Sequence, residues 1–143
     1  QHHAFARPLV NSGRLSVPCV YDEMPLNGPD KLHAPHVSRV GAPCPDAPLG
    51  DGYVLNALVG GFTLLALNAD VPTEVTGVTE ADVTARVVPV PDDAITDDLR
   101  ARYLGDAKSA VYLIRPDQHV AARWADFDTA SVRAALRTAC GME

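Results

Sequence analysis

Proline and glycine interrupt the front part of this 143-residue chain more than any other part. Between Pro8 and Gly52 one or the other recurs every few residues, and no long periodic pattern survives there, because proline lacks a backbone donor and both residues favour turns. An irregular stretch of this length is unusual inside a compact domain, so we expect it to pack along something, such as a domain outside this chain. We divide the chain into an irregular segment, residues 1–52, and an ordered domain, residues 53–143.

Two strands and a helical turn are predicted at the start of the ordered domain. The apolar residues of segment 54–59 indicate a helical turn that ends at two glycines. Segment 62–67 is almost entirely apolar, which is typical of a central strand buried on both faces. Segment 84–90 predicts a second strand that ends at Pro89 and Pro91, since proline cannot donate to a sheet.

Two helices are predicted further along the chain. Thr96 is a capping residue, and Leu99 and Tyr103 lie four apart on one face of the helix that follows. Asp128 caps a final helix. The apolar stripe of that helix consists of Val132, Ala135, Leu136, Ala139 and Cys140.

The clearest hairpin lies between these helices. Segments 109–114 and 119–124 are strand-like, and the tetrapeptide 115–118 joins them. Pro116 presets the backbone of a tight turn, and Asp117 can accept a hydrogen bond from the backbone ahead of it. A final hairpin and helix after an earlier strand, helix and strand predict a thioredoxin-like α/β sandwich, with a central mixed sheet and flanking helices.

The charge balance excludes several classes of partner. The chain has 12 Lys and Arg against 18 Asp and Glu, a formal net charge of −6. Binding to nucleic acid or to an anionic membrane needs a concentrated basic face, so we predict neither partner. No apolar run approaches the length of a membrane span, and no targeting signal is recognisable, which favours a cytoplasmic protein.

The cysteines do not support redox catalysis. Cys19, Cys44 and Cys140 are odd in number and far apart, unlike a disulfide framework or a zinc ribbon. A thioredoxin-like oxidoreductase needs a thiolate where its first strand leads into a helix, because the helix end lowers the thiol pKa. Segment 68–72 occupies this place here and contains no cysteine.

Other chemistry also finds little support. His33 and His36 could join Cys44 at a zinc ion, but their spacing is poor, and a structural histidine is the better interpretation. His119 is expected in a turn or at the surface. Neither the glycine pattern of a dinucleotide site nor that of a nucleophilic serine occurs.

Four short motifs occur in a fixed order along almost the whole chain. They are segments 11–16 (NSGRLS), 34–37 (APHV), 61–65 (GFTLL) and 113–121 (LIRPDQHVA). Together they resemble the C-terminal region of FAD-dependent aromatic hydroxylases, with the 3-(3-hydroxyphenyl)propionate hydroxylase group nearest.

The resemblance implies a flavoprotein monooxygenase that takes electrons from NADH or NADPH and hydroxylates a phenolic ring. In this family the FAD motif and the substrate-binding sheet precede the C-terminal region, which is a thioredoxin-like domain without redox cysteines. Residues 1–52 would then be the tail of the substrate domain. The implied partners are the remainder of the hydroxylase and further copies of the same enzyme.

No catalytic, cofactor-binding or metal-binding residue is therefore expected in this chain, and FAD and NAD(P)H belong to the full-length enzyme. The structural or interface candidates are His36, Arg115, Pro116, Asp117 and Trp124. His36 would fix the path into the domain, the three turn residues would shape the hairpin, and Trp124 would serve an interface or the core. The alternatives are a stand-alone thioredoxin-like binding module and a small redox or metal-dependent enzyme.

Overall fold

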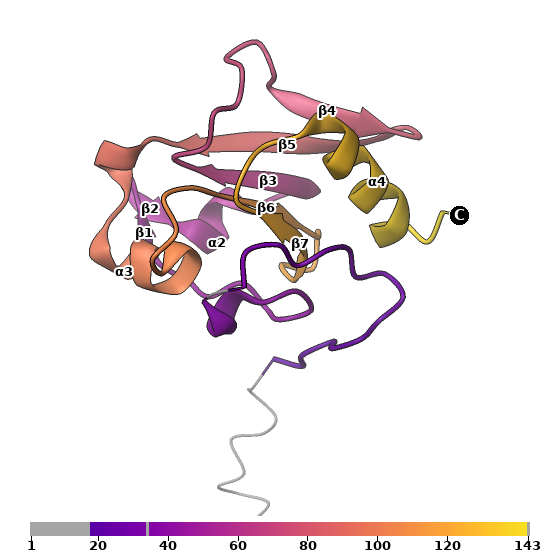
Figure 1. Ribbon diagram of the computed structural model, residues 1–143, viewed down its shortest axis with the longest axis horizontal. Helices are drawn as coiled ribbons and strands as arrows, with labels where there is room; N and C mark the ends of the chain where they lie inside the picture. Colours follow the sequence, from indigo (N-terminus) through magenta and orange to yellow (C-terminus); the bar gives the residue numbers. More distant parts are fainter. Residues whose placement is uncertain (1–17, 34, 143) are drawn as a thin grey trace, which may run out of the picture.

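A five-stranded mixed sheet forms the centre of the domain (Figure 1), in a computed structural model that describes residues 18–33 and 35–142. The strand order is β4-β5-β3-β6-β7. The strands are β3 (Phe62–Leu67), β4 (Gly77–Glu80), β5 (Val83–Val90), β6 (Ala110–Ile114) and β7 (Val120–Trp124). The motif of residues 11–16 lies outside the described residues.

The strand directions confirm the predicted α/β class. β3 pairs in parallel with β5 and antiparallel with β6, and β6 pairs antiparallel with β7. The parallel pair β3 and β5 requires a long connection, whereas the antiparallel pair β6 and β7 needs only the tight turn after Ile114. The strand order around β3 and the helix after β7 are those of a thioredoxin-like sandwich.

Helix α4 (Thr129–Ala139) covers one face of the sheet. Its N-terminus is capped as predicted, because the Asp128 carboxylate accepts a hydrogen bond of 2.8 Å from the Ser131 backbone N–H. Its apolar stripe packs on β4, β6 and β7, among them Val78, Leu113 and Ala122. No described helix is long and apolar enough to cross a membrane.

Short helices and turns cover the opposite face (Figure 1). They include η1 (His36–Ser38), α2 (Val54–Ala57), η2 (Asp92–Ala94), α3 (Asp97–Leu99) and η3 (Arg100–Leu104), with a small sheet of β1 (Pro48–Leu49) and β2 (Gly52–Tyr53). The Thr96 hydroxyl caps α3 by accepting from the Leu99 N–H, as predicted. Leu99 and Tyr103 are both fully buried, so the predicted apolar face of this helix meets the core.

One detail of the sheet differs from the prediction. Strand β4 was not predicted; it lies in the connection between β3 and β5 and forms one edge of the sheet. Strand β5, Val83–Val90, agrees with the predicted segment 84–90 and includes Pro89. The Val87 N–H donates to Thr76, on the side of β5 that faces β4. Pro89, two residues further on, faces the same side but lies beyond the last pair of β4 and β5. The N–H that proline lacks would therefore have had no strand partner there.

The other edge of the sheet is covered by the front segment, residues 18–33 and 35–47. It runs beside β7 (Figure 1) and exchanges backbone hydrogen bonds with it. Gly28 donates to Ala121 at 2.7 Å, and Val120 donates to Ala42 at 2.9 Å. An uncovered edge strand would offer free donors and acceptors to other chains, so this cover protects β7 from aggregation. The segment also adds buried side chains to the core: Leu32, Ala42, Cys44 and Ala47.

A substitution at Gly28 tests how closely the front segment packs. A Cβ there would lie 3.0 Å from the Ala122 Cβ and 3.3 Å from the Ala135 Cβ, neither of which can rotate away. We expect Gly28→Ala to lower the free energy of unfolding by about 1–2 kcal/mol in urea denaturation, because the contact overpacks the site. Gly52→Ala is the matched control: a Cβ there meets only Asn56 at 3.6 Å. Equal stability of the two variants would contradict the close packing.

Candidate functional site

The carboxyl ends of the parallel strands β3 and β5 are where a thioredoxin-like enzyme would carry its thiols. An open hollow of about 540 Å³ lies there. Its walls contain carboxylates, prolines and small apolar groups, but no sulfur and no imidazole: Ala66, Asn68, Ala69, Asp70, Pro89, Val90, Pro91 and Asp92. Its lining residues therefore cannot exchange a disulfide.

The thiols that the chain does have are placed elsewhere. Cys44 is buried in the core beside Tyr103, and burial raises its pKa to about 12. It is therefore a protonated thiol at neutral pH and a poor nucleophile. Cys19 is exposed, Cys140 is half-buried at the end of α4, and all three are free.

The hollow at the strand ends does not suit a flavin. Asp70 and Asp92 line it, and their carboxylates would repel the pyrophosphate of FAD. Within residues 18–33 and 35–142, no three His, Cys, Asp or Glu side chains lie close enough together to hold one ion.

The most unusual buried group is the guanidinium of Arg123 on β7, whose side chain is only 2% exposed. Its Nε donates to the Asp30 carboxylate at 2.7 Å, and one terminal nitrogen donates to the Pro35 carbonyl at 2.6 Å. The same nitrogen lies 3.4 Å from the Ser38 hydroxyl. A buried charge is tolerated only when it is paired and hydrogen-bonded, so these three acceptors allow Arg123 to stay inside.

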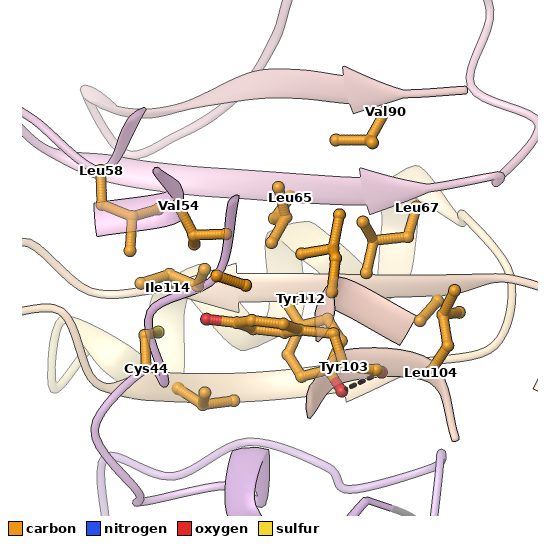
Figure 2. Close-up of a cluster of buried hydrophobic side chains, with 14 of the residues drawn as sticks. Cys44, Val54, Leu58, Leu65, Leu67, Val90, Tyr103, Leu104, Tyr112 and Ile114 are labelled. Atoms are coloured by element: carbon orange, nitrogen blue, oxygen red, sulfur yellow. Dashed lines mark hydrogen bonds between the residues drawn. The ribbon is translucent and has the colours of Figure 1, made fainter. Parts of the chain in front are cut away.

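A chain of hydroxyl groups continues from Arg123 into the core. The Tyr112 hydroxyl donates to the backbone carbonyl of Tyr103 at 2.6 Å (Figure 2). Since this uses its only proton, Tyr112 can only accept from the Ser38 hydroxyl, which lies 3.0 Å away and is closer to Tyr112 than to its other acceptor, the Pro35 carbonyl at 3.5 Å. The Ser38 oxygen in turn accepts from Arg123. The network therefore has one direction, from the guanidinium through Ser38 and Tyr112 to the η3 backbone.

The network also shifts acid strengths. Burial by itself would raise the pKa of Asp30, but the hydrogen bond and charge of Arg123, aided by backbone N–H groups, hold it below its usual value. Burial raises the pKa of Tyr112 and that of Tyr103. The Tyr103 hydroxyl donates to the Pro45 carbonyl at 2.6 Å, and Arg102 donates to the Asp46 carbonyl. Helical segment η3 thus holds a second part of the front segment.

The hairpin turn makes the third attachment of the front segment. Arg115 and Asp117 form an ion pair of 2.5 Å, and the Arg115 guanidinium lies 5.7 Å from the centre of the Tyr21 ring. The His119 ring packs on Tyr21, with ring centres 4.8 Å apart, and its Nε2 lies 2.9 Å from the Cys19 carbonyl. His119, expected in a turn or at the surface, therefore joins the hairpin to residues 19–21.

The five candidate residues do not form one cluster. Arg115, Pro116 and Asp117 share the turn, with Pro116 and Asp117 exposed. His36 is exposed on η1, and its side chain makes no hydrogen bond with any described residue, whereas its backbone carbonyl accepts from Arg39. Trp124 is buried in the core beneath α4. Whether any of the five contacts a partner stays a prediction.

The central residue of the network, Arg123, was not singled out from the sequence. Its signal was present, because Arg123 follows Val120, Ala121 and Ala122 inside a strand that is otherwise apolar. A charged side chain in such a strand indicates a buried pair. Its partners Asp30 and Ser38 lie 93 and 85 residues earlier, and no local pattern points to them.

Fold and site together define a thioredoxin-like α/β domain that lacks a thiol at the strand end and uses its buried polar groups to hold its own front segment. The chain belongs to the family of aromatic-ring hydroxylases and is their C-terminal domain, because the family model "Aromatic-ring hydroxylase, C-terminal" matches residues 37–142. The sequence matches no curated protein.

A solved structure shares this fold. The chain is similar to aklavinone-11 hydroxylase, which was crystallised as a ternary complex with FAD and aklavinone. The TM-score is 0.61 at 21% sequence identity, and the match covers 91% of this chain. The chain spans only 28% of the length of that protein.

Removal of the Tyr112 hydroxyl tests the hydrogen-bond chain. Tyr112→Phe removes the nearer partner of the Ser38 hydroxyl, which keeps only the Pro35 carbonyl at 3.5 Å, and it takes the Tyr112 donor from the Tyr103 carbonyl. We expect a loss of about 1–3 kcal/mol in the free energy of unfolding. Tyr53→Phe, which removes a hydroxyl from an exposed ring, is the control and should change stability little. A neutral effect at Tyr112 would show that the hydroxyl is dispensable.

Asp30→Asn tests the pairing with Arg123. We expect a loss of about 1–2 kcal/mol at pH 7, at the low end for a buried charge because the Asp30 side chain is 31% exposed. Since the folded-state pKa of Asp30 lies below its ordinary 3.8, the pairing is fully present above that pH and is lost as pH falls through the lower value.

The gap between wild type and Asp30→Asn in chemical denaturation should therefore close as the pH falls below 3.8. Asp126→Asn, at an exposed aspartate, is the control and should show no gap at pH 7. A gap at Asp30 that stays constant down to the acid transition would rule out the ionic contribution.

Proposed function

We propose that this chain is a non-catalytic domain of its hydroxylase, with a role in the structure of the enzyme or in the association of its subunits. The proposal rests on one observation: buried polar side chains form hydrogen bonds within the chain itself. Arg123, Asp30 and Tyr112 are engaged in hydrogen bonds within the chain, and the Cys44 thiol is held protonated. These groups, of which Arg123, Tyr112 and Cys44 are buried, thus serve the structure of the domain, which supports a structural role.

The proposed parent enzyme is an FAD-dependent monooxygenase that uses NADH or NADPH and hydroxylates a phenolic ring, as in enzymes of the 3-(3-hydroxyphenyl)propionate hydroxylase group. Membership in the aromatic-ring hydroxylase family supports the reaction class, and the flavin in the similar aklavinone-11 hydroxylase supports the cofactor. Flavin and substrate would bind to the preceding part of the enzyme. A cytoplasmic homo-oligomer active in the breakdown of aromatic compounds completes the proposal.

One observation favours a second candidate, a stand-alone binding module. The domain has its own core on both faces of the sheet, and the front segment covers the β7 edge. A domain of this kind does not depend on a neighbour for its folding.

The size and colour of the native protein separate the two candidates. An antibody against this chain should detect a band several times heavier than 15.2 kDa in the source cells, because the chain spans 28% of the similar hydroxylase. The purified native protein should be yellow, with the absorbance spectrum of bound flavin, whereas the isolated chain should be colourless. A native band of about 15 kDa would contradict the hydroxylase proposal and favour the module.

A further inference from the structure

An apolar hollow of about 550 Å³ lies on the outer side of the front segment. Its walls include Pro18, Val20, Val37, Pro43 and Pro45, with Cys44 beneath them. Val37 is 51% exposed and Val20 is 37% exposed. We call this surface the Val20–Val37 hollow.

Two exposed apolar side chains line this hollow. The described residues include five exposed large apolar side chains, and Val20 and Val37 are the two of them in the lining. Single exposed apolar residues are ordinary, but two valines that line one concave surface together with three prolines are typical of an interaction site.

The hollow has a fixed shape. Tyr21 donates a backbone hydrogen bond of 2.8 Å to Gly41, and Gly41 donates one of 2.8 Å to Val120 on β7. The Cys44 N–H donates to the Gln118 carbonyl at 2.8 Å, and Ser38 is held by Tyr112. Because both walls are attached to the sheet or its hairpin, a partner would not have to order them on binding, which favours docking.

The lining is also chemically inert. The buried Cys44 thiol stays protonated at neutral pH, since its pKa is raised to about 12. Arg39, at the rim, is already paired with Asp22 at 3.1 Å. His36 is the remaining polar group of the lining, and its side chain is exposed. The hollow thus fits an apolar protein surface better than a charged or reactive small molecule.

The path of the chain indicates where such a surface comes from. Pro18 lines the hollow, and a part of the enzyme that precedes this chain would be linked to the domain through Pro18. A covalent link of this kind keeps the preceding part of the protein at a high effective concentration beside the hollow. The similar hydroxylase is several times longer than this chain, as the 28% coverage shows.

We propose that the Val20–Val37 hollow is the docking surface for the preceding, flavin- and substrate-binding part of the hydroxylase. This inference rests on the proposed function. It assigns the contact between the two parts to apolar packing against Val20 and Val37, in addition to the peptide link.

Cys19 provides a native reporter of this contact. It is exposed and lies between Pro18 and Val20 at the rim. We expect its alkylation by a maleimide, followed by peptide mass spectrometry, to be at least about tenfold slower in the full-length native protein than in the 143-residue chain, because docking covers the rim. Amide hydrogen exchange of residues 36–45 should slow in the same comparison.

A pair of variants at exposed valines tests the apolar contact. In the full-length protein, Val37→Asp should restore fast alkylation of Cys19, whereas Val59→Asp, at a 71% exposed valine outside the hollow, should leave it slow. In the 143-residue chain both variants should melt at the wild-type temperature, which excludes misfolding as the cause.

The outcomes separate this inference from the proposed function. A native protein of about 15 kDa overturns both. A heavier, yellow native protein that shows equal alkylation of Cys19 and equal exchange of residues 36–45 in both forms overturns the docking surface alone. Protection that persists in Val37→Asp also overturns it, because the contact would then not depend on the hollow.

Discussion

The buried guanidinium of Arg123 is the interaction on which the arrangement of the front segment depends. Its partners, Asp30, Pro35 and Ser38, lie on a stretch of chain with little regular structure. Their hydrogen bonds with the buried guanidinium hold this stretch against β7. Without those acceptors an unpaired charge would remain inside the domain, so the front segment stabilises the sheet that it covers. The same acceptors fix Ser38, and through it the Tyr112 hydroxyl, so that one charge on an edge strand determines the position of three segments.

Much of the sheet could be predicted because its signals are local. The apolar run of β3, the caps Thr96 and Asp128, and the turn between β6 and β7 each depend on a few adjacent residues. Strand β4 was missed because its four residues, Gly77–Glu80, carry no apolar run and it forms through pairing with β5. Strand β5 was predicted within one residue of its bounds, because the apolar segment 84–90 and Pro91 after it are local signals.

The candidate site was predicted only in part, for the same reason. Turn chemistry identified Arg115 and Asp117, whose ion pair exists, but it could not show that Tyr21 would lie against the turn. The sequence showed directly that segment 68–72 contains no cysteine. In the structure, residues of this segment line a hollow together with prolines and carboxylates. The sheet thus has a thioredoxin-like topology, but the described lining of its strand ends contains no thiol.

The cover of β7 by the front segment has a consequence for biosynthesis. Asp30 is made 93 residues before Arg123, so the front segment leaves the ribosome well ahead of the strand that it must pair with. At cellular rates of synthesis the interval is roughly 5 to 20 s. During that time Leu32 and Cys44, later buried, have no sheet to pack on. A nascent chain of this protein therefore passes through a stage in which these apolar residues are exposed to water until β7 has been synthesised.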